Sequence, residues 1–164
     1  MTSLLAHRVR ALASSVLEGL AVGGLVASRE APPWSRPRVL ISAAAGAALT
    51  ADQASLELPA MLREHRATGT VSPAPPHERR ALAHAGAHAL VVGLLLQVLD
   101  RPVRDRLAQR GVRHPHRWFG AIAAVAHLAA LAPVYWRLAA DRARADAERE
   151  AAIEAELQEM AAGR

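Results

Sequence analysis

The chain contains a pair of histidines, His84 and His88, four residues apart near the start of an apolar stretch at residues 80–101. On an α-helix this spacing places both imidazole rings on one face, about one turn apart. Two imidazoles placed in this way can bind one metal ion together or act as acid and base beside a carboxylate. The pair alone is weak evidence, because a chain with 8 histidines contains such spacings by chance. Its meaning depends on which other side chains the fold brings beside it.

The apolar stretch that contains these histidines predicts a membrane span. Residues 81–99 carry no formally charged side chain, and the second half of this segment is apolar around the whole circumference of a helix. A helix of about 20 such residues crosses the hydrocarbon core of a bilayer. The whole chain is 52% hydrophobic and 21% charged, and the charges are separated from the apolar runs. This separation is typical of integral membrane proteins.

Four segments qualify as spans by the same reasoning, at about residues 11–28, 38–62, 81–99 and 118–136. All five aromatic residues fall at predicted span ends, where membrane proteins carry aromatic belts. In the first span, Gly19, Gly23 and Gly24 let a neighbouring helix approach closely. We therefore expect an all-α fold, an integral membrane bundle of four antiparallel transmembrane helices within residues 1–138. The polar, alanine-rich residues 139–164 predict a helical C-terminal tail.

Ionisable side chains from different predicted spans lie at a similar depth. If the spans are antiparallel and rise ~1.5 Å per residue, four such side chains lie roughly 10 to 15 Å below the same membrane surface. They are Glu18, Asp52, His88 and His127. Because a charged group inside a bilayer costs about 2.5 to 3.5 kcal/mol, these residues should face the bundle interior and contact one another. We expect a polar site in this layer, with His84 nearer the surface.

This layer has the residue types for two kinds of chemistry. The ligand types that bind zinc or non-haem iron are present in His84, His88, His127, Glu18 and Asp52. Without a metal, Glu18 or Asp52 beside His88 can serve as an acid/base pair acting on an apolar molecule. The preferred function is therefore an enzyme that acts on a lipophilic small molecule by acid/base or metal-assisted chemistry.

Three other functions fit the same residues. The polar layer can be a structural hydrogen-bond network in a non-catalytic membrane subunit, whose tail contacts a protein partner. Chains of acids and histidines also conduct protons or ions. Haem, with His88 and His127 as axial ligands, is a weaker alternative because the acids would lie beside an apolar macrocycle. The sequence leaves these functions open beside the enzyme.

Composition limits the partners and the location. The net charge of +5 comes from arginines at the ends of apolar runs, so we expect the lipid bilayer, and no nucleic acid, as a partner. The chain has no cysteine, which excludes thiolate metal sites. Glu18 interrupts the first apolar run, and this favours a retained span over a signal peptide. We expect a plasma membrane of bacterial type; the arginines are divided almost evenly between its two sides, which leaves the orientation open.

Overall fold

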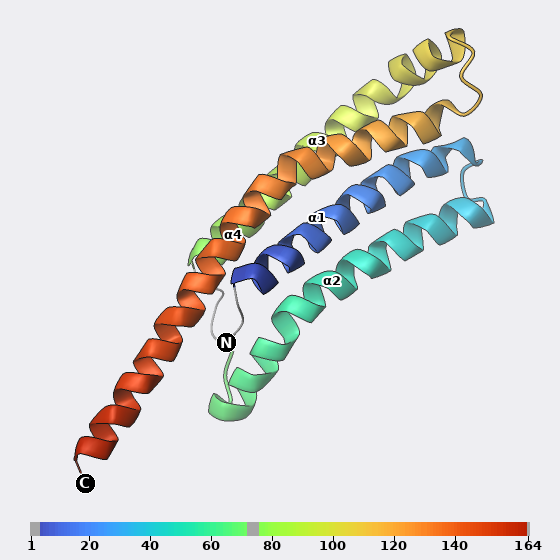
Figure 1. Ribbon diagram of the computed structural model, residues 1–164. Helices are drawn as coiled ribbons and strands as arrows, with labels where there is room; N and C mark the ends of the chain where they lie inside the picture. The colour runs from blue at the N-terminus through green and yellow to red at the C-terminus, as the bar shows by residue number, and fades with distance from the viewer. Residues whose placement is uncertain (1–3, 72–75, 164) are drawn as a thin grey trace.

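The computed structural model describes residues 4–71 and 76–163, and the fold is all-helical (Figure 1). The helices along the chain are α1 (Leu4–Ala27), the short 3₁₀ helix η1 (Ser28–Glu30), α2 (Arg36–Thr68), α3 (Pro76–Gln109) and α4 (Pro115–Ala162). No strand occurs among the described residues. The predicted all-α class is therefore confirmed. Four helices are long and apolar enough to cross a membrane.

Prolines and glycines set several of the helix ends. The chain leaves η1 through Pro32 and Pro33, which have no backbone N–H to continue a helix. α2 ends at Gly69, whose φ of 73° is the left-handed conformation that closes a helix. Gly111, with a φ of 77°, lies in the turn that follows α3. These residues explain where the chain reverses direction.

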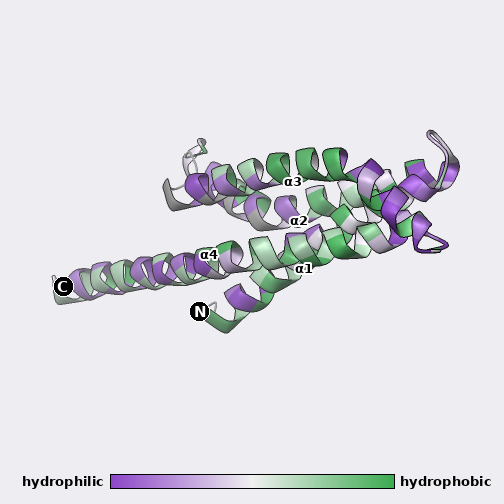
Figure 2. Cartoon of the chain, turned by 90° about the horizontal axis from the view of Figure 1, so that it is seen from above, coloured by the Kyte–Doolittle hydropathy of each residue, from purple (hydrophilic) through white to green (hydrophobic). Residues whose placement is uncertain are grey.

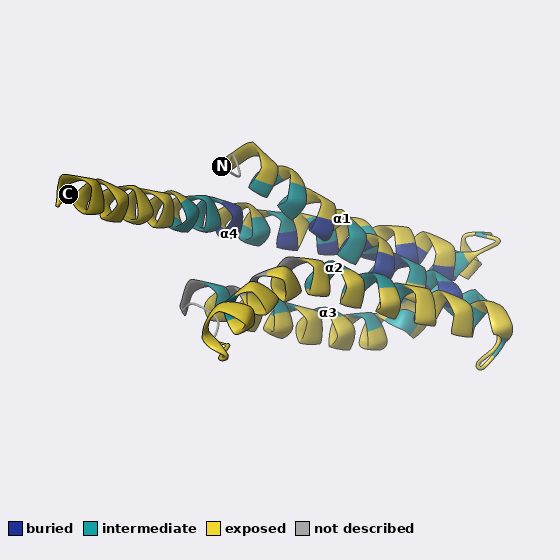
Figure 3. Cartoon of the chain, turned by 90° about the horizontal axis from the view of Figure 1, so that it is seen from below, coloured by how far each residue is buried: buried dark blue, intermediate teal, exposed yellow. Residues whose placement is uncertain are grey.

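Three prolines lie inside helices rather than at their ends. They are Pro59 in α2, Pro102 in α3 and Pro133 in α4, and each helix continues through its proline. As a result α3 extends well beyond the predicted span, and α4 is one continuous helix of 48 residues. The polar tail is therefore the continuation of α4, and residues 147–163 are exposed (Figure 3).

The closest helix pair is α1 with α4, and glycines bring the two backbones together. A Cβ atom added to Gly120 would lie 2.5 Å from the carbonyl oxygen of Gly23, and one added to Gly23 would lie 2.7 Å from that of Gly120. A larger residue at either position must push the helices apart. A Cβ atom on Gly19 would lie 3.0 Å from the carbonyl oxygen of Ala124. The predicted close approach at Gly19 and Gly23 is confirmed, whereas Gly24 faces α2.

A small apolar core lies beside these glycines. Its buried members are Val26, Phe119 and Ala123, and side chains of α3 pack against them. Every buried residue of the described part of the chain belongs to α1, η1 or α4, as the dark blue segments of Figure 3 indicate. The α1 and α4 pair is thus the centre of the molecule.

The other two helices lie on this central pair. α2 packs along α1 and α3 packs along α4, so that α1 and α4 lie between α2 and α3 in Figure 1. In the described residues, direct contact between α2 and α3 is marginal. α1 and α4 run in opposite directions, because Glu30 contacts His116 at one end and His7 contacts Asp146 at the other. Figure 2 shows that the middle of α3 is strongly apolar.

Candidate functional site

Four side chains meet between α1, α3 and α4, and we call them the inner cluster: Glu18, His88, His127 and Tyr135. Glu18 of α1 is the central member, with its Oε2 3.5 Å from Nε2 of His127. Its Oε1 accepts a hydrogen bond from the Tyr135 hydroxyl. The ring of His88, on α3, lies against that of His127, with 5.2 Å between centroids and an interplanar angle of 45°. The cluster is therefore a continuous row of hydroxyl, carboxylate, imidazole and imidazole.

The glycine contact positions this row. Gly19 follows Glu18 directly, and the close approach of α1 to α4 at this level brings the carboxylate within reach of His127. Tyr135 lies about two turns further along α4, so its long side chain meets Glu18 from the other side. His88 comes from α3, which packs along α4. Three helices thus supply one polar site.

His127 of the inner cluster is buried and the other three members are partly buried, but the hydrogen bonding of the cluster is incomplete. His127 is 4% exposed, and Ser14, one turn before Glu18, is 3% exposed. Nδ1 of His127, Nε2 of His88 and Oγ of Ser14 are buried atoms without a hydrogen-bond partner among the described residues. A buried polar group left without a partner costs roughly 1 to 3 kcal/mol. The cluster therefore contains hydrogen-bonding atoms that the described part of the chain leaves unsatisfied.

Asp52 and His84, the other two predicted members, make no hydrogen bond or ion pair with this cluster in the described part of the chain, although Asp52 is close enough to Tyr135 to interact with it electrostatically. The Asp52 carboxylate accepts a hydrogen bond of 2.6 Å from Arg10, whose guanidinium also donates to the Asp52 carbonyl oxygen and to the Ser55 hydroxyl. This contact joins α2 to α1. His84 is exposed on α3. Of the five residues predicted for the site, the structure brings together the three that belong to the inner cluster.

The inner cluster contains one pair suited to acid/base chemistry. The Glu18 carboxylate lies beside the His127 imidazole, and the His88 ring packs against that of His127 without a hydrogen bond between them in the described part of the chain. A carboxylate beside an imidazole can accept or donate a proton. In the described parts of the chain, no three or more histidine, aspartate or glutamate side chains form a group that could hold a metal ion. The zinc or iron site stays a prediction.

The sequence predicts no functional role for two of the residues in these contacts. Tyr135 is expected there only as an aromatic residue at a span end, yet it binds Glu18. The one sequence feature that could have indicated this contact is the position of Tyr135 about two turns from His127 on the same helix. Arg10 is expected before the first span, but α1 already begins at Leu4, so Arg10 lies inside the helix and reaches Asp52. No pattern in the sequence identifies this pairing.

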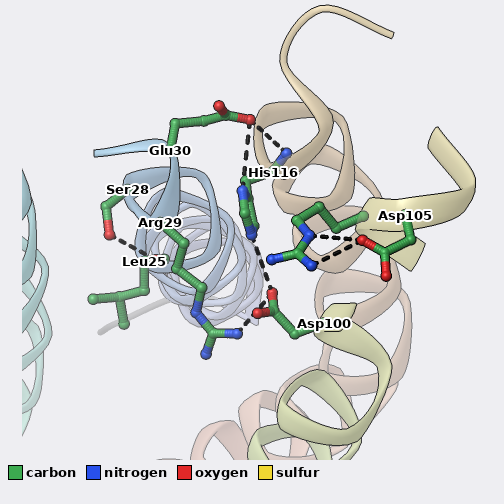
Figure 4. A network of polar contacts seen from close by, with 8 residues as sticks. Leu25, Ser28, Arg29, Glu30, Asp100, Asp105 and His116 are labelled. Carbon is green, nitrogen blue, oxygen red and sulfur yellow. Dashed lines mark hydrogen bonds and ion pairs between the residues drawn. The ribbon is translucent and has the colours of Figure 1, made fainter. Parts of the chain in front are cut away.

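A second polar network joins η1 to the second half of α3 and to the first turn of α4 (Figure 4). We call it the outer cluster, and its members are Arg29, Glu30, Asp100 and His116. Oδ1 of Asp100 lies 3.0 Å from Nη1 of Arg29 and 3.5 Å from Nε2 of His116. Oε1 of Glu30 accepts a hydrogen bond of 2.7 Å from the backbone N–H of His116. Because His116 is in the first turn of α4, Glu30 caps that end of the helix.

The inner and outer clusters are two polar sites along one set of helices. The outer cluster holds arginine, histidine and carboxylates as ion pairs, whereas the inner cluster has one carboxylate and no arginine. Both clusters contain buried atoms without a hydrogen bond, but Oδ1 of Asp100 in the outer cluster lies in ion pairs with Arg29 and His116. The unpaired imidazole nitrogens make the inner cluster the better candidate for chemistry. Comparisons with family models, with curated proteins and with solved structures found no match to this chain.

Proposed function

We propose that the chain is an integral membrane protein whose inner cluster binds a lipophilic small molecule and exchanges protons with it. The four helices α1 to α4 are antiparallel membrane spans, and the substrate reaches the cluster from the lipid. The observation that carries this proposal is the group of three buried polar atoms, on Ser14, His88 and His127, that lack a partner among the described residues.

Membrane insertion is supported by the exposed apolar surface. Leu90, Leu94 and Val98 recur at intervals of four along α3 and are 71%, 67% and 72% exposed. Leu20 of α1 and Val125 of α4 are exposed on other faces of the molecule. Soluble monomers rarely expose apolar surface of this extent, whereas a bilayer covers it with lipid chains.

The charge of the inner cluster also fits a membrane interior. Glu18 is the one charged residue between Arg10 and Arg29, and it faces α4 rather than the surrounding lipid. An ionisable residue in a membrane is costly unless it faces the bundle interior and finds partners. Tyr135 and His127 are those partners, so Glu18 can be accommodated at this depth.

His88 is the proposed catalytic residue, because it is the histidine of the row that is only partly buried. A substrate beside its imidazole can lose a proton to the ring and regain one at another atom, which is an isomerisation that needs no co-reactant. His127 and Glu18 act behind it as positioning residues. The Glu18 carboxylate contacts His127, and the His127 ring packs against that of His88 and holds it in place.

Co-purification tests the binding part of this proposal. The full-length protein, purified in detergent, is extracted with organic solvent, and the extract is analysed by mass spectrometry. We expect a lipophilic molecule that the wild type retains and that His88→Ala and Glu18→Gln lose, while the matched outer-cluster variant Glu30→Gln retains it. Equal retention by all four proteins would contradict the proposal. Metal analysis and an absorption spectrum of the same sample test zinc, iron and haem.

Deuterium exchange tests the chemical part and does not require that the substrate be identified first. The protein is incubated in D₂O with a lipid extract of the membranes in which it is expressed, and lipids that gain deuterium on carbon are identified by mass spectrometry. Because acid/base groups contribute about 10² to 10⁴ in rate, His88→Ala should slow the exchange by at least about 100-fold. Exchange at the wild-type rate in this variant rejects His88 as the catalytic residue.

A second candidate function is a non-catalytic membrane subunit in which the inner cluster only joins the helices. The observation in its favour is that both carboxylate oxygens of Glu18 already have partners within the chain. In that case Glu18→Gln lowers the thermal stability, no lipid gains deuterium in the wild type, and no lipophilic molecule is retained. The two experiments above therefore separate the two functions.

A further inference from the structure

An open groove of about 710 Å³ lies beside the outer cluster, between the beginning of α2 and the second half of α3. Arg38 of α2 and Gln97, Val98 and Arg101 of α3 are among the residues that line it. Arg29, Glu30 and Asp100 of the outer cluster form another part of the wall. The lining therefore contains three arginines and two carboxylates, which leaves one excess positive charge.

The two carboxylates of the groove are already engaged. Asp100 lies 3.0 Å from Arg29, and Glu30 accepts the backbone hydrogen bond of His116. Arg38 and Arg101 have no hydrogen-bond or ion-pair partner among the described residues, and they come from two different helices. With Arg29 paired to Asp100, the one excess positive charge of the groove comes from Arg38 and Arg101 set against the single remaining carboxylate, Glu30.

We propose that this groove binds the phosphate group of an anionic phospholipid. Arg38 and Arg101 contact the phosphate oxygens from opposite walls, because guanidinium groups bind phosphate through paired, charge-assisted hydrogen bonds. The side-chain amide of Gln97 is a further donor. The apolar stripe of α3 that begins at Val98 continues past Leu94 to Leu90, and it provides a surface for the acyl chain.

The beginning of α2 adds to the attraction for an anion. Ser35 precedes this helix, but its hydroxyl donates to the carbonyl oxygen of Pro32 and makes no cap to the backbone of α2. Pro37 has no N–H, so the free donors of the first turn are the N–H groups of Arg36 and Arg38, and their partial positive charge favours a phosphate nearby. Since Arg38 is in this first part of α2, the helix end and the side chain act on the same region.

A bound phosphate also supplies a contact that the chain lacks. α2 and α3 touch only marginally in the described residues, and Arg38 and Arg101 lie on either side of the groove between them. A phosphate held by both arginines joins the two helices. The choice of a phospholipid over soluble phosphate rests on the membrane insertion proposed above. The binding of a phosphate group rests on the groove alone.

Lipid retention in nanodiscs tests the proposal. The full-length protein is reconstituted into nanodiscs with equal amounts of phosphatidylcholine and phosphatidylglycerol, then released into mild detergent, and the bound lipids are counted by native mass spectrometry. We expect the wild type to retain phosphatidylglycerol in preference. In the double variant Arg38→Gln/Arg101→Gln this preference should fall by about tenfold or more, because each arginine contributes favourably to binding an anionic headgroup.

Arg106→Gln is the matched control for a single charge. Arg106 is exposed near the same end of α3 but is not part of the groove, so its variant should retain phosphatidylglycerol like the wild type. Each single variant, Arg38→Gln and Arg101→Gln, is compared with this control. No preference in the wild type, or an equal loss in Arg106→Gln and in the groove variants, overturns the proposal.

Two further measurements separate the possible sources of failure. Alkaline extraction of membranes tests insertion for every variant, so a protein that is extracted contradicts the proposed function rather than the groove. Inorganic phosphate added to the detergent-purified protein tests the soluble source. If it raises the thermal midpoint of the wild type but not of the double variant, and phosphatidylglycerol is not retained, the phosphate site is supported and the lipid as its occupant is overturned.

Discussion

The inner and outer clusters are built from the same three parts of the chain, yet they differ in composition. Each takes a carboxylate from α1 or η1, one residue from α3 and a histidine from α4. Corresponding members are about 11 or 12 residues apart in sequence, roughly 17 Å along a helix. Between the two clusters lie the glycine contact and the core around Phe119.

The difference between the clusters lies in how their charges are compensated. In the outer cluster Asp100 lies between Arg29 and His116, and Glu30 caps α4, so each carboxylate serves to join elements. In the inner cluster a single carboxylate lies beside a pair of imidazoles, and buried atoms lack partners among the described residues. The same helix geometry thus supports two clusters, one in which arginine and histidine compensate the carboxylates and one in which imidazole nitrogens stay unpaired.

The largest effect is expected at the contact that separates the two clusters. In Gly120→Ala the new Cβ would lie 2.5 Å from the Gly23 carbonyl oxygen. We expect the free energy of unfolding to fall by about 1 to 3 kcal/mol, because the helices must move apart and both clusters are displaced. Thermal unfolding in detergent, followed by circular dichroism, measures this loss. Gly93→Ala is the control, since a Cβ atom there has no neighbour within 4 Å; equal midpoints for the two variants would contradict the packing.

The ion pairs of the outer cluster should stabilise the fold. Asp100→Asn removes the charge that faces Arg29 and His116, which are on different elements. We expect a loss of about 1 kcal/mol in the free energy of unfolding, since the pair is partly exposed. Asp105→Asn removes an exposed pair with the adjacent Arg104 and should have a smaller effect. If both variants unfold at the same temperature, the outer cluster is not a stabilising network.

Two adjacent serines near the inner cluster should change the free energy of unfolding in opposite directions when each is replaced by alanine. Both are buried, but Ser15 donates a hydrogen bond of 2.9 Å to the Ala11 carbonyl oxygen, whereas Ser14 Oγ has no partner among the described residues. Ser14→Ala should raise the free energy of unfolding by about 0.5 to 1 kcal/mol, and Ser15→Ala should lower it by a similar amount. Thermal midpoints of the two variants measure the signs. A loss in both would show that Ser14 Oγ is hydrogen-bonded.

The smallest effect is expected from the end of α4, which contacts neither cluster. A chain that stops after residue 152 loses the exposed Ile153, Leu157 and Met160. We expect the free energy of unfolding to change by less than about 0.5 kcal/mol, because the removed residues are exposed. Unfolding of the shortened chain and its elution on size-exclusion chromatography check this. A lower midpoint together with a smaller particle would indicate that the tail joins copies of the chain.

Much of the fold can be predicted from the separation of charges and apolar runs. Four uncharged or nearly uncharged segments give four helices, and the prolines and glycines between them give the reversals. The helix ends are harder to predict, because alanine and arginine are good helix formers, and α4 therefore continues through the polar tail. The pattern of apolar residues predicts which residues form a helix, but it does not predict where that helix leaves its packed neighbours.

The site can be predicted in part, since counting residues along antiparallel spans gives depth. It places Glu18, His88 and His127 in one layer, and these three lie together in the structure. Depth says nothing about the rotation of a helix about its axis. Asp52 has a suitable depth, but its face of α2 meets Arg10. The rotation of each helix is set by packing, which the sequence alone does not give.

The length of α4 has a mechanical consequence. Its 48 residues correspond to about 70 Å, more than twice the ~30 Å hydrocarbon thickness of a bilayer. In the proposed membrane arrangement the part beyond Trp136 extends about 40 Å away from the spans. His127 and Tyr135 are on this same helix, on either side of Pro133. In the proposed arrangement, a tilt of α4 by about 10° at the inner cluster would move its far end by about 7 Å, so a small change inside the membrane would become a larger displacement in the water beyond it.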